Sequence, residues 1–132
     1  MNVRLAGIEL PSEIQWVDEF AGHGVGQIIE PTLTGALIVE ETAQVNGRPI
    51  TLESNASAWV DRSTVELLSG LAATPLASGS TLTLEWGDGR TFDVVFDHSR
   101  GAPFSAEEVR RLAAGAQTPT HKYLITINLL TA

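Results

Sequence analysis

Short windows of alternating apolar and polar residues, separated by glycine, proline or asparagine, constrain the fold of this chain more than any other feature. The clearest window is Thr81–Trp86, which is followed by Asp88-Gly89 and then by Thr91–Phe96. Alternation with a period of two places successive side chains on opposite faces of a strand, and Asp-Gly tolerates the positive φ angles of a tight hairpin turn. The pattern therefore predicts a mainly β, antiparallel fold.

The same pattern predicts strands over most of the chain. Asn46-Gly47 is a second hairpin signal, since both residues tolerate a positive φ, and it would join residues 32–42 to residues 50–53. Gly35 lies inside the longest of these strands and is expected to form a bulge or a close backbone approach. Further strands are expected over residues 3–10 with a break near Gly7, over residues 14–20 and over residues 123–130.

Two capping patterns interrupt the alternation and predict helices. Ser63, with Glu66 three places later, precedes an apolar stripe at helical spacing, and Pro75 would end that helix after residue 73. Residues 105–108 begin a second segment, closed by Gly115, that local propensity favours as a short amphipathic helix over residues 105–115. The expected fold class is mainly β with one or two short helices, in which an antiparallel split barrel or sandwich-like sheet carries a packed helix.

Large apolar side chains are expected to form the core of this sheet. Tryptophan and phenylalanine contribute the largest apolar areas that a core can bury. Exposed tryptophans would instead favour a carbohydrate-binding platform, which is the alternative for these residues. The residues assigned to the core are Trp16, Trp59, Trp86, Phe92, Phe96 and Leu68.

Length and composition limit the classes to which the protein can belong. The 132 residues are enough for one domain with a sizeable core, so residues 1–132 are expected to form a single β-rich domain. The absence of cysteine excludes disulfides, thiolate zinc sites and a cysteine nucleophile. The net charge of −8 argues against nucleic acid as a partner, because binding to phosphates depends on Lys and Arg.

The hydropathy pattern lacks the signals of a membrane span and of export. No run approaches about 18 consecutive apolar residues, the length that a membrane span needs. The first ten residues also lack the apolar core of a secretion signal. Neither a membrane span nor standard export is therefore expected.

The segment 20–29 holds three glycines and a histidine within five positions: Gly22, His23, Gly24, Val25 and Gly26 stand between apolar neighbours. A dinucleotide fingerprint needs Gly-x-Gly-x-x-Gly between a strand and a helix. Here the spacing is Gly-x-Gly-x-Gly, and Pro31 prevents a helix from following. We therefore expect a connecting loop that bends the chain and contacts a neighbouring subunit, with no cofactor.

Metal binding and catalysis have no positive signal in the sequence. Three histidines, His23, His98 and His121, could act as ligands together with Asp97, Asp18 or Glu19, but exposed loop histidines are the simpler interpretation. Adjacent carboxylates occur at residues 18–19, 40–41 and 107–108, where strand geometry would separate the two groups by face. No Gly-x-Ser-x-Gly elbow is present. The chain is therefore expected not to be an enzyme and to hold no metal.

Several of these pieces stand in an order that resembles a family of short proteins encoded among tailed-phage and prophage tail genes. Its members look like small β-rich virion proteins of the tail tip or baseplate, similar in design to the split-barrel domains of distal tail proteins and to tail-tube subunits. The chain departs from the family at residues 101–120, where such proteins are more often extended, so residues 105–115 are either helical or extended. The pieces that carry the resemblance are IELP at 8–11, IQWVDE at 14–19, LTGALIVEE at 33–41, GRPITL at 47–52, WV at 59–60 before TVE at 64–66, and DGRTF at 88–92.

The resemblance implies a structural component of a phage tail end that works by subunit–subunit assembly. Its partners would be other tail proteins and further copies in a homo-oligomeric ring, and it would be assembled in the host cytoplasm and located in the virion. A tail-assembly chaperone or a small carbohydrate-binding adhesin module is the alternative. Arg110-Arg111 could pair subunits or form an ordinary solvated helix face. The residues expected at interfaces are Gly22, His23, Gly24, Val25, Gly26, Asn46, Gly47, Arg100, Arg110 and Arg111.

Overall fold

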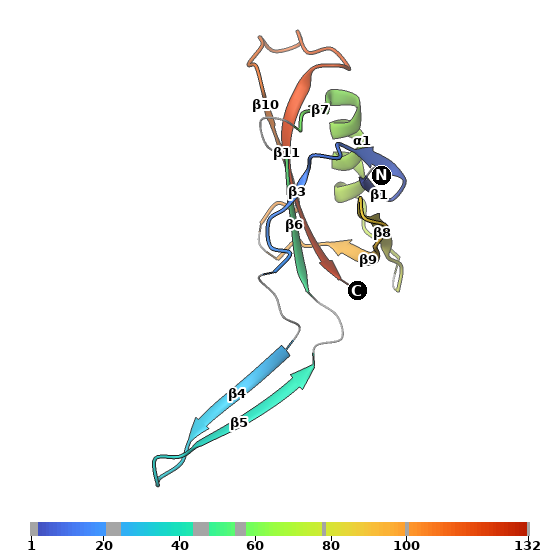
Figure 1. The fold of residues 1–132 in the computed structure, drawn as a ribbon. Coiled ribbons are helices and arrows are strands. Elements are labelled where there is room, and N and C mark those ends of the chain that lie inside the picture. The colour runs from blue at the N-terminus through green and yellow to red at the C-terminus, as the bar shows by residue number, and fades with distance from the viewer. Residues whose placement is uncertain are drawn as a thin grey trace.

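The computed structural model describes residues 3–20, 25–43, 48–54, 58–77, 79–99 and 101–131, without the side chains of residues 25, 26, 42 and 43. Over these residues the chain is mainly β, with antiparallel strands and one helix. The fold class predicted from the sequence is confirmed at this level. Figure 1 shows a body built from most of the strands and the helix, with a two-stranded hairpin extending away from it.

A single long strand, β11 (Lys122–Thr131), organises the sheet of the body. It pairs with β6, β7, β9 and β10, and the sheet follows the order β2-β1-β8-β9-β11-β6-β3. Alternate side chains of β11 are buried, as the apolar sequence of this segment predicts. The other strands of this sheet are β1 (Val3–Leu5), β2 (Ile8–Leu10), β3 (Gln15–Trp16), β6 (Pro49–Glu53), β7 (Val60–Asp61), β8 (Leu82–Glu85), β9 (Thr91–Phe96) and β10 (Phe104–Glu108).

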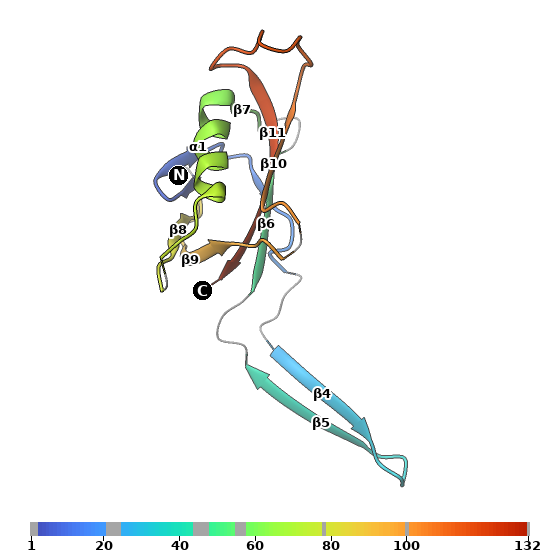
Figure 2. The same ribbon diagram turned by 180° about the vertical axis from the view of Figure 1, so that it is seen from behind.

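The hairpin, called the arm below, consists of β4 (Val25–Pro31) and β5 (Leu37–Ala43). The two strands pair along their whole length, from Val25 opposite Ala43 to Pro31 opposite Leu37. Among the described residues they pair only with each other. Figures 1 and 2 show the arm projecting from the end of the body where β6 begins and β11 ends.

The helix α1 (Arg62–Ala73) packs beside β2, β7, β10 and β11. Its end before Pro75 is confirmed, but the predicted capping box is wrong, because the cap residue is Asp61 and Ser63 lies within the first turn. The first free N–H groups of the helix are satisfied by backbone instead. Arg62 donates to the carbonyl of His121 at 2.9 Å and Ser63 to that of Pro119 at 3.1 Å. The side chain of Glu66 accepts from Arg62 at 3.1 Å, one turn back along the helix.

The core lies between the sheet and α1. Leu68 and Trp16 are buried and Phe96 is 9% exposed, as predicted, while Trp86 and Phe92 are partly buried with their rings 5.5 and 5.4 Å from Trp16. Trp59 was predicted to be a core residue, and this prediction is wrong, since its side chain is 48% exposed. Its neighbours Ala58 and Val60 are buried, so strand alternation turns Trp59 outward.

The second predicted helix, over residues 105–115, is also wrong. Residues Phe104–Glu108 form β10, which pairs with β11 from Phe104 opposite Ile127 to Glu108 opposite Tyr123. Residues 109–121 then form turns and irregular backbone that lead into β11. Pairing with the edge of β11 supplies hydrogen bonds that a short isolated helix would have to make alone, and it overrides the local helix propensity.

The long strand predicted over residues 32–42 is wrong in its first half. Residues 32–36 form the turn of the arm, and Gly35 lies there with φ +86°, its N–H donating to the carbonyl of Thr32 at 3.1 Å, instead of forming a bulge. The hairpin predicted across Asn46-Gly47 is wrong in its pairing, because β5 pairs with β4 whereas β6 pairs with β3 and β11. Asn46 and Gly47 themselves lie outside the described residues.

Three other predictions concern the ends of strands and the turns between them. The break near Gly7 is a complete hairpin turn, in which Ala6 and Gly7 both have a positive φ and β1 pairs with β2. The strand predicted over residues 14–20 is shortened to β3, which pairs with β6. The Asp88-Gly89 hairpin between β8 and β9 is confirmed, with Gly89 at φ +96°.

Candidate assembly surface

The arm presents large apolar side chains to solvent. Six of them are about half exposed or more, and the side chain of Leu33 at the tip is fully exposed. Elsewhere on the described surface, the large exposed apolar residues are scattered over several elements. The six arm residues are Ile28, Ile29, Leu33, Leu37, Ile38 and Val39.

The register of the arm sorts its side chains onto two different faces, because directly opposed residues in a pair of strands share a face. Ile29 opposite Val39 and Pro31 opposite Leu37 make an apolar face. Ile28 opposite Glu40 and Glu30 opposite Ile38 make the other, which we call the acidic face. On the acidic face, isoleucine and glutamate therefore alternate both along each strand and across the pair of strands.

Polar contacts join the body residues that precede the arm in the chain to those that follow it. Asp18 accepts hydrogen bonds from the backbone N–H of Thr51 at 2.7 Å and from its hydroxyl at 3.1 Å, so the segments before and after the arm are joined. The guanidinium of Arg48 donates to the carbonyl of Glu19, and that of Arg90 to the carboxylate of Glu19 at 2.7 Å. Arg48 and Arg90 also lie over the ring of Trp16. These contacts hold the two body segments that flank the arm in the sequence against one another.

The segment between β10 and β11 lies at the opposite end of the molecule from the arm (Figures 1 and 2). Glu108 organises this segment by accepting hydrogen bonds from the N–H of Leu112 at 3.2 Å and from the side chain of Gln117 at 3.4 Å, while His121 faces it at 3.1 Å. The pKa of Glu108 is lowered, most by the hydrogen bond from the N–H of Leu112 and next by the one with the side chain of His121.

A groove of about 420 Å³ opens on this segment. It combines apolar side chains with cationic ones, and its tryptophan is the one that alternation turns out of the core. We call it the basic groove. Its walls include Trp59, Val109, Arg110, Leu112, His121 and Lys122.

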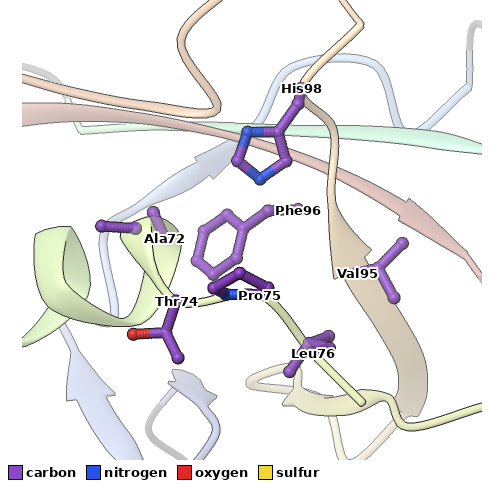
Figure 3. Close-up of a pocket in the computed structure, with 8 residues that line it drawn as sticks. Ala72, Thr74, Pro75, Leu76, Val95, Phe96 and His98 are labelled. Carbon is purple, nitrogen blue, oxygen red and sulfur yellow. The ribbon is translucent and has the colours of Figure 1, made fainter. Parts of the chain in front are cut away.

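A second pocket, of about 340 Å³, lies where α1 ends against β9. Figure 3 shows its walls, in which the ring of Phe96 and the side chains of Val95, Pro75 and Leu76 surround the space near His98. The neighbouring Asp97 is buried and accepts from the N–H and hydroxyl of Ser99 at 2.9 and 2.5 Å. This carboxylate therefore holds a turn.

The residues predicted to carry interfaces fall into three groups. Val25 and Gly26 begin β4, at the base of the arm, and are part of a strand instead of the predicted loop. Arg110 and Arg111 follow β10 and are exposed, but on irregular backbone and not on a helix face. The remaining residues, Gly22, His23, Gly24, Asn46, Gly47 and Arg100, lie outside the described residues.

The arm itself was missed in the sequence. Its signal was present as two apolar runs, residues 27–31 and 37–41, separated by a Thr-Leu-Thr-Gly turn sequence. The exposed Trp59 was also missed, although alternation with Ala58 and Val60 is visible in the sequence. The structure does not bring the predicted interface residues together, since Val25 and Arg110 belong to opposite ends of the molecule.

The described candidates for metal binding form no ligand cluster, and His23 lies outside the described residues. Within the residues that the structure describes, no group of three or more His, Cys, Asp or Glu could hold a metal ion. His121 pairs with Glu108, while His98 stands at the pocket of Figure 3. In the same residues, no helix is both long and apolar enough to cross a membrane.

Comparison of the chain with protein-family models, with curated proteins and with solved structures found no match. The resemblance to phage tail proteins therefore depends on the sequence pieces quoted above.

Proposed function

We propose that this protein is a structural component of a phage tail end, at the tail tip, baseplate or distal tail ring, and that it acts by subunit–subunit assembly. The observation that supports this proposal is the arm, a two-stranded hairpin with six large apolar side chains exposed to solvent. The order of the tail-protein sequence pieces supports the choice of a phage tail. The partners would be further copies of the chain and other tail proteins.

The arm needs a partner for physical reasons. A two-stranded hairpin alone is marginally stable in water, and contiguous apolar patches on a monomer mark interaction sites. The outer edges of β4 and β5 also carry backbone groups that, within the described residues, pair with no other strand. Such an edge can pair with a strand of a neighbouring subunit. In a closed ring of identical subunits, the backbone groups of every such edge then have a hydrogen-bond partner.

The proposal is tested by the composition of purified tail particles. Virions of the phage or prophage whose genome encodes this chain should contain it in a fixed copy number, measured by quantitative mass spectrometry against a tail protein of known stoichiometry. A copy number that is a multiple of the ring symmetry is the expected result. Absence of the chain from particles whose assembly requires it would identify a tail-assembly chaperone and contradict the proposal.

The exposed side chain of Trp59 favours a second candidate function, a carbohydrate-binding adhesin module. Trp59 is 48% exposed at the basic groove, and exposed tryptophans stack on sugar rings. This candidate requires a change in tryptophan fluorescence when glycans are added, and the change should disappear in Trp59→Ala. Trp16 is buried and Trp86 is partly buried, so the change can be assigned to Trp59 by comparison with this variant.

A further inference from the structure

We propose that the acidic face of the arm of one copy binds in the basic groove of the next copy, so that identical subunits join head to tail. This inference rests on the proposed assembly function and names the surface that accepts the arm. The acidic face comprises Ile28, Glu30, Ile38 and Glu40, and the basic groove is the one lined by Trp59, Val109 and Arg110.

The two surfaces are complementary in charge. The acidic face carries the carboxylates of Glu30 and Glu40, and residues 25–43 contain no Lys or Arg. Glu41 lies on the other face, where it accepts a hydrogen bond from Gln27 at 2.6 Å. Residues 109–122 contain Arg110, Arg111 and Lys122 and no Asp or Glu. Lys122 is paired with Asp61, but Arg110 and Arg111 form no ion pair with any described carboxylate. The two arginines can therefore pair with carboxylates from another molecule without first breaking a bond within this part of the chain.

The two surfaces also match in how apolar and charged groups are mixed. On the arm, each isoleucine of the acidic face stands opposite a glutamate. In the groove, Trp59 and Val109 are exposed beside Arg110. Tryptophan and arginine are the residues that most often dominate binding energy at interfaces, where a central apolar contact is surrounded by polar groups. An alternating apolar and acidic face fits such a groove better than a uniformly apolar face would.

The positions of the two surfaces require a second copy. In both views of the molecule, the arm and the segment after β10 project from opposite ends of the body (Figures 1 and 2). The arm of a chain therefore cannot reach the groove of the same chain. A contact between different patches of identical subunits is heterologous, and it closes into a ring or continues as a stack according to the rotation at each junction.

Charge reversal on each side tests the contact. The arm variant Glu30→Lys with Glu40→Lys and the groove variant Arg110→Glu with Arg111→Glu should each raise the dissociation constant for self-assembly at least about tenfold, because like charges then face each other. All four positions are exposed, so the fold should be unaffected, which circular dichroism checks. The matched control for the arm variant is Glu13→Lys with Glu85→Lys, which makes the same change in net charge on the body and should assemble like the unmodified chain.

Combining the arm and groove substitutions, in one chain or by mixing the two variant proteins, decides whether the two surfaces contact each other. A chain with all four substitutions should recover assembly, and so should an equimolar mixture of the arm and groove variants, because each reversed arm then meets a reversed groove. Light scattering with size-exclusion chromatography measures both. If reversed arm and groove do not rescue one another, or if the groove variant assembles normally, the inference is overturned.

The failure of this inference can be distinguished from failure of the proposed function. If the arm variant is impaired while the groove variant assembles normally, the arm still drives assembly and a different surface accepts it. If the intact chain stays monomeric and is absent from particles, both proposals fail. The milder pairs Glu30→Gln with Glu40→Gln and Arg110→Gln with Arg111→Gln should weaken assembly in the same direction, and they replace the reversals if those variants do not fold.

Discussion

Glu108 is the residue on which the geometry of the basic groove depends most. Its carboxylate accepts from the N–H of Leu112 and from Gln117, and it faces His121, so one side chain holds three points of the segment between β10 and β11. That segment carries Val109 and Arg110, which line the groove. Hydrogen bonds to the charged form lower the pKa of Glu108 below its ordinary value of 4.5.

This pKa has a consequence for stability that Glu108→Gln can test. The unfolded chain binds a proton at Glu108 near pH 4.5, whereas the folded chain does so only at a lower pH. The carboxylate therefore stabilises the fold fully above pH 4.5, and this contribution is lost as the pH falls through the lowered pKa. The unmodified chain should be more stable than the variant at neutral pH, and the difference should narrow towards about pH 3.

Urea unfolding of both proteins from about pH 6 to about pH 3 measures this difference in free energy. Glu107→Gln is the matched control, because Glu107 is exposed on the neighbouring position of β10. Its effect should be small at every pH. A difference between the chain and Glu108→Gln that stays constant with pH would contradict the role assigned to the Glu108 carboxylate.

The arm and the body are separate elements in energetic terms. Within the described residues, β4 and β5 pair only with each other, whereas the buried core is formed by the body strands and α1. The arm therefore contributes little to the cooperative unfolding of the body. Its conformation matters for assembly, and its turn depends on Gly35, whose φ of +86° is one that L residues rarely adopt.

Two glycine substitutions should separate these elements. Gly35→Val introduces strain of at least about 1–2 kcal/mol into the arm turn, so it should weaken self-assembly and leave the thermal midpoint of the body almost unchanged. Gly70 lies in an exposed part of α1, and a Cβ added there would meet open space. The substitution Gly70→Ala should therefore stabilise the body by about 1 kcal/mol and leave assembly unchanged.

Calorimetry and light scattering on the same samples check both variants. We expect Gly35→Val to change self-assembly but not the thermal midpoint of the body. We expect Gly70→Ala to change the thermal midpoint but not self-assembly. A large fall in the midpoint for Gly35→Val would show that arm and body unfold together.

The sequence predicted those elements whose stability is local. The β8–β9 hairpin follows from Asp88-Gly89 and from alternation, and β11 follows from its run of β-branched and apolar residues. Two features of the body that the sequence did not predict are decided by distant contacts. Residues 104–108 are extended because the edge of β11 accepts them, and α1 begins at Arg62 because carbonyls of Pro119 and His121 satisfy its first N–H groups.

The candidate site was predicted less well than the fold. The sequence predicted interfaces at the glycine segment, at Asn46-Gly47, at Arg100 and at Arg110-Arg111, and the arm begins with Val25 and Gly26 of the first of these. What alternation alone could not indicate was that the hairpin of residues 25–43 would stand away from the body. An apolar run is normally assigned to a core, and its exposure becomes visible only when the pairing of all strands is known.

The whole molecule is elongated, with the arm at one end and the basic groove at the other (Figures 1 and 2). Its net charge of −8 keeps free subunits apart at low concentration, while the local charges of the arm and groove are opposite in sign. Complementary patches of this kind set the register and the rate of association, and apolar burial supplies most of the affinity. This combination suits a subunit that must remain separate until it joins an assembly.

Assembly through the arm is tested most directly by the molar mass of the intact chain in solution. Light scattering measures this mass over a range of concentrations. We predict a rise from the 14.1 kDa monomer to a defined oligomer, and its loss when the apolar side chains on the acidic face of the arm are changed by Ile28→Thr and Ile38→Thr. The control Leu67→Thr, on the exposed side of α1, should assemble normally. An intact chain that stays monomeric at every concentration, or an arm variant that assembles as well as the unmodified chain, would contradict assembly through the arm.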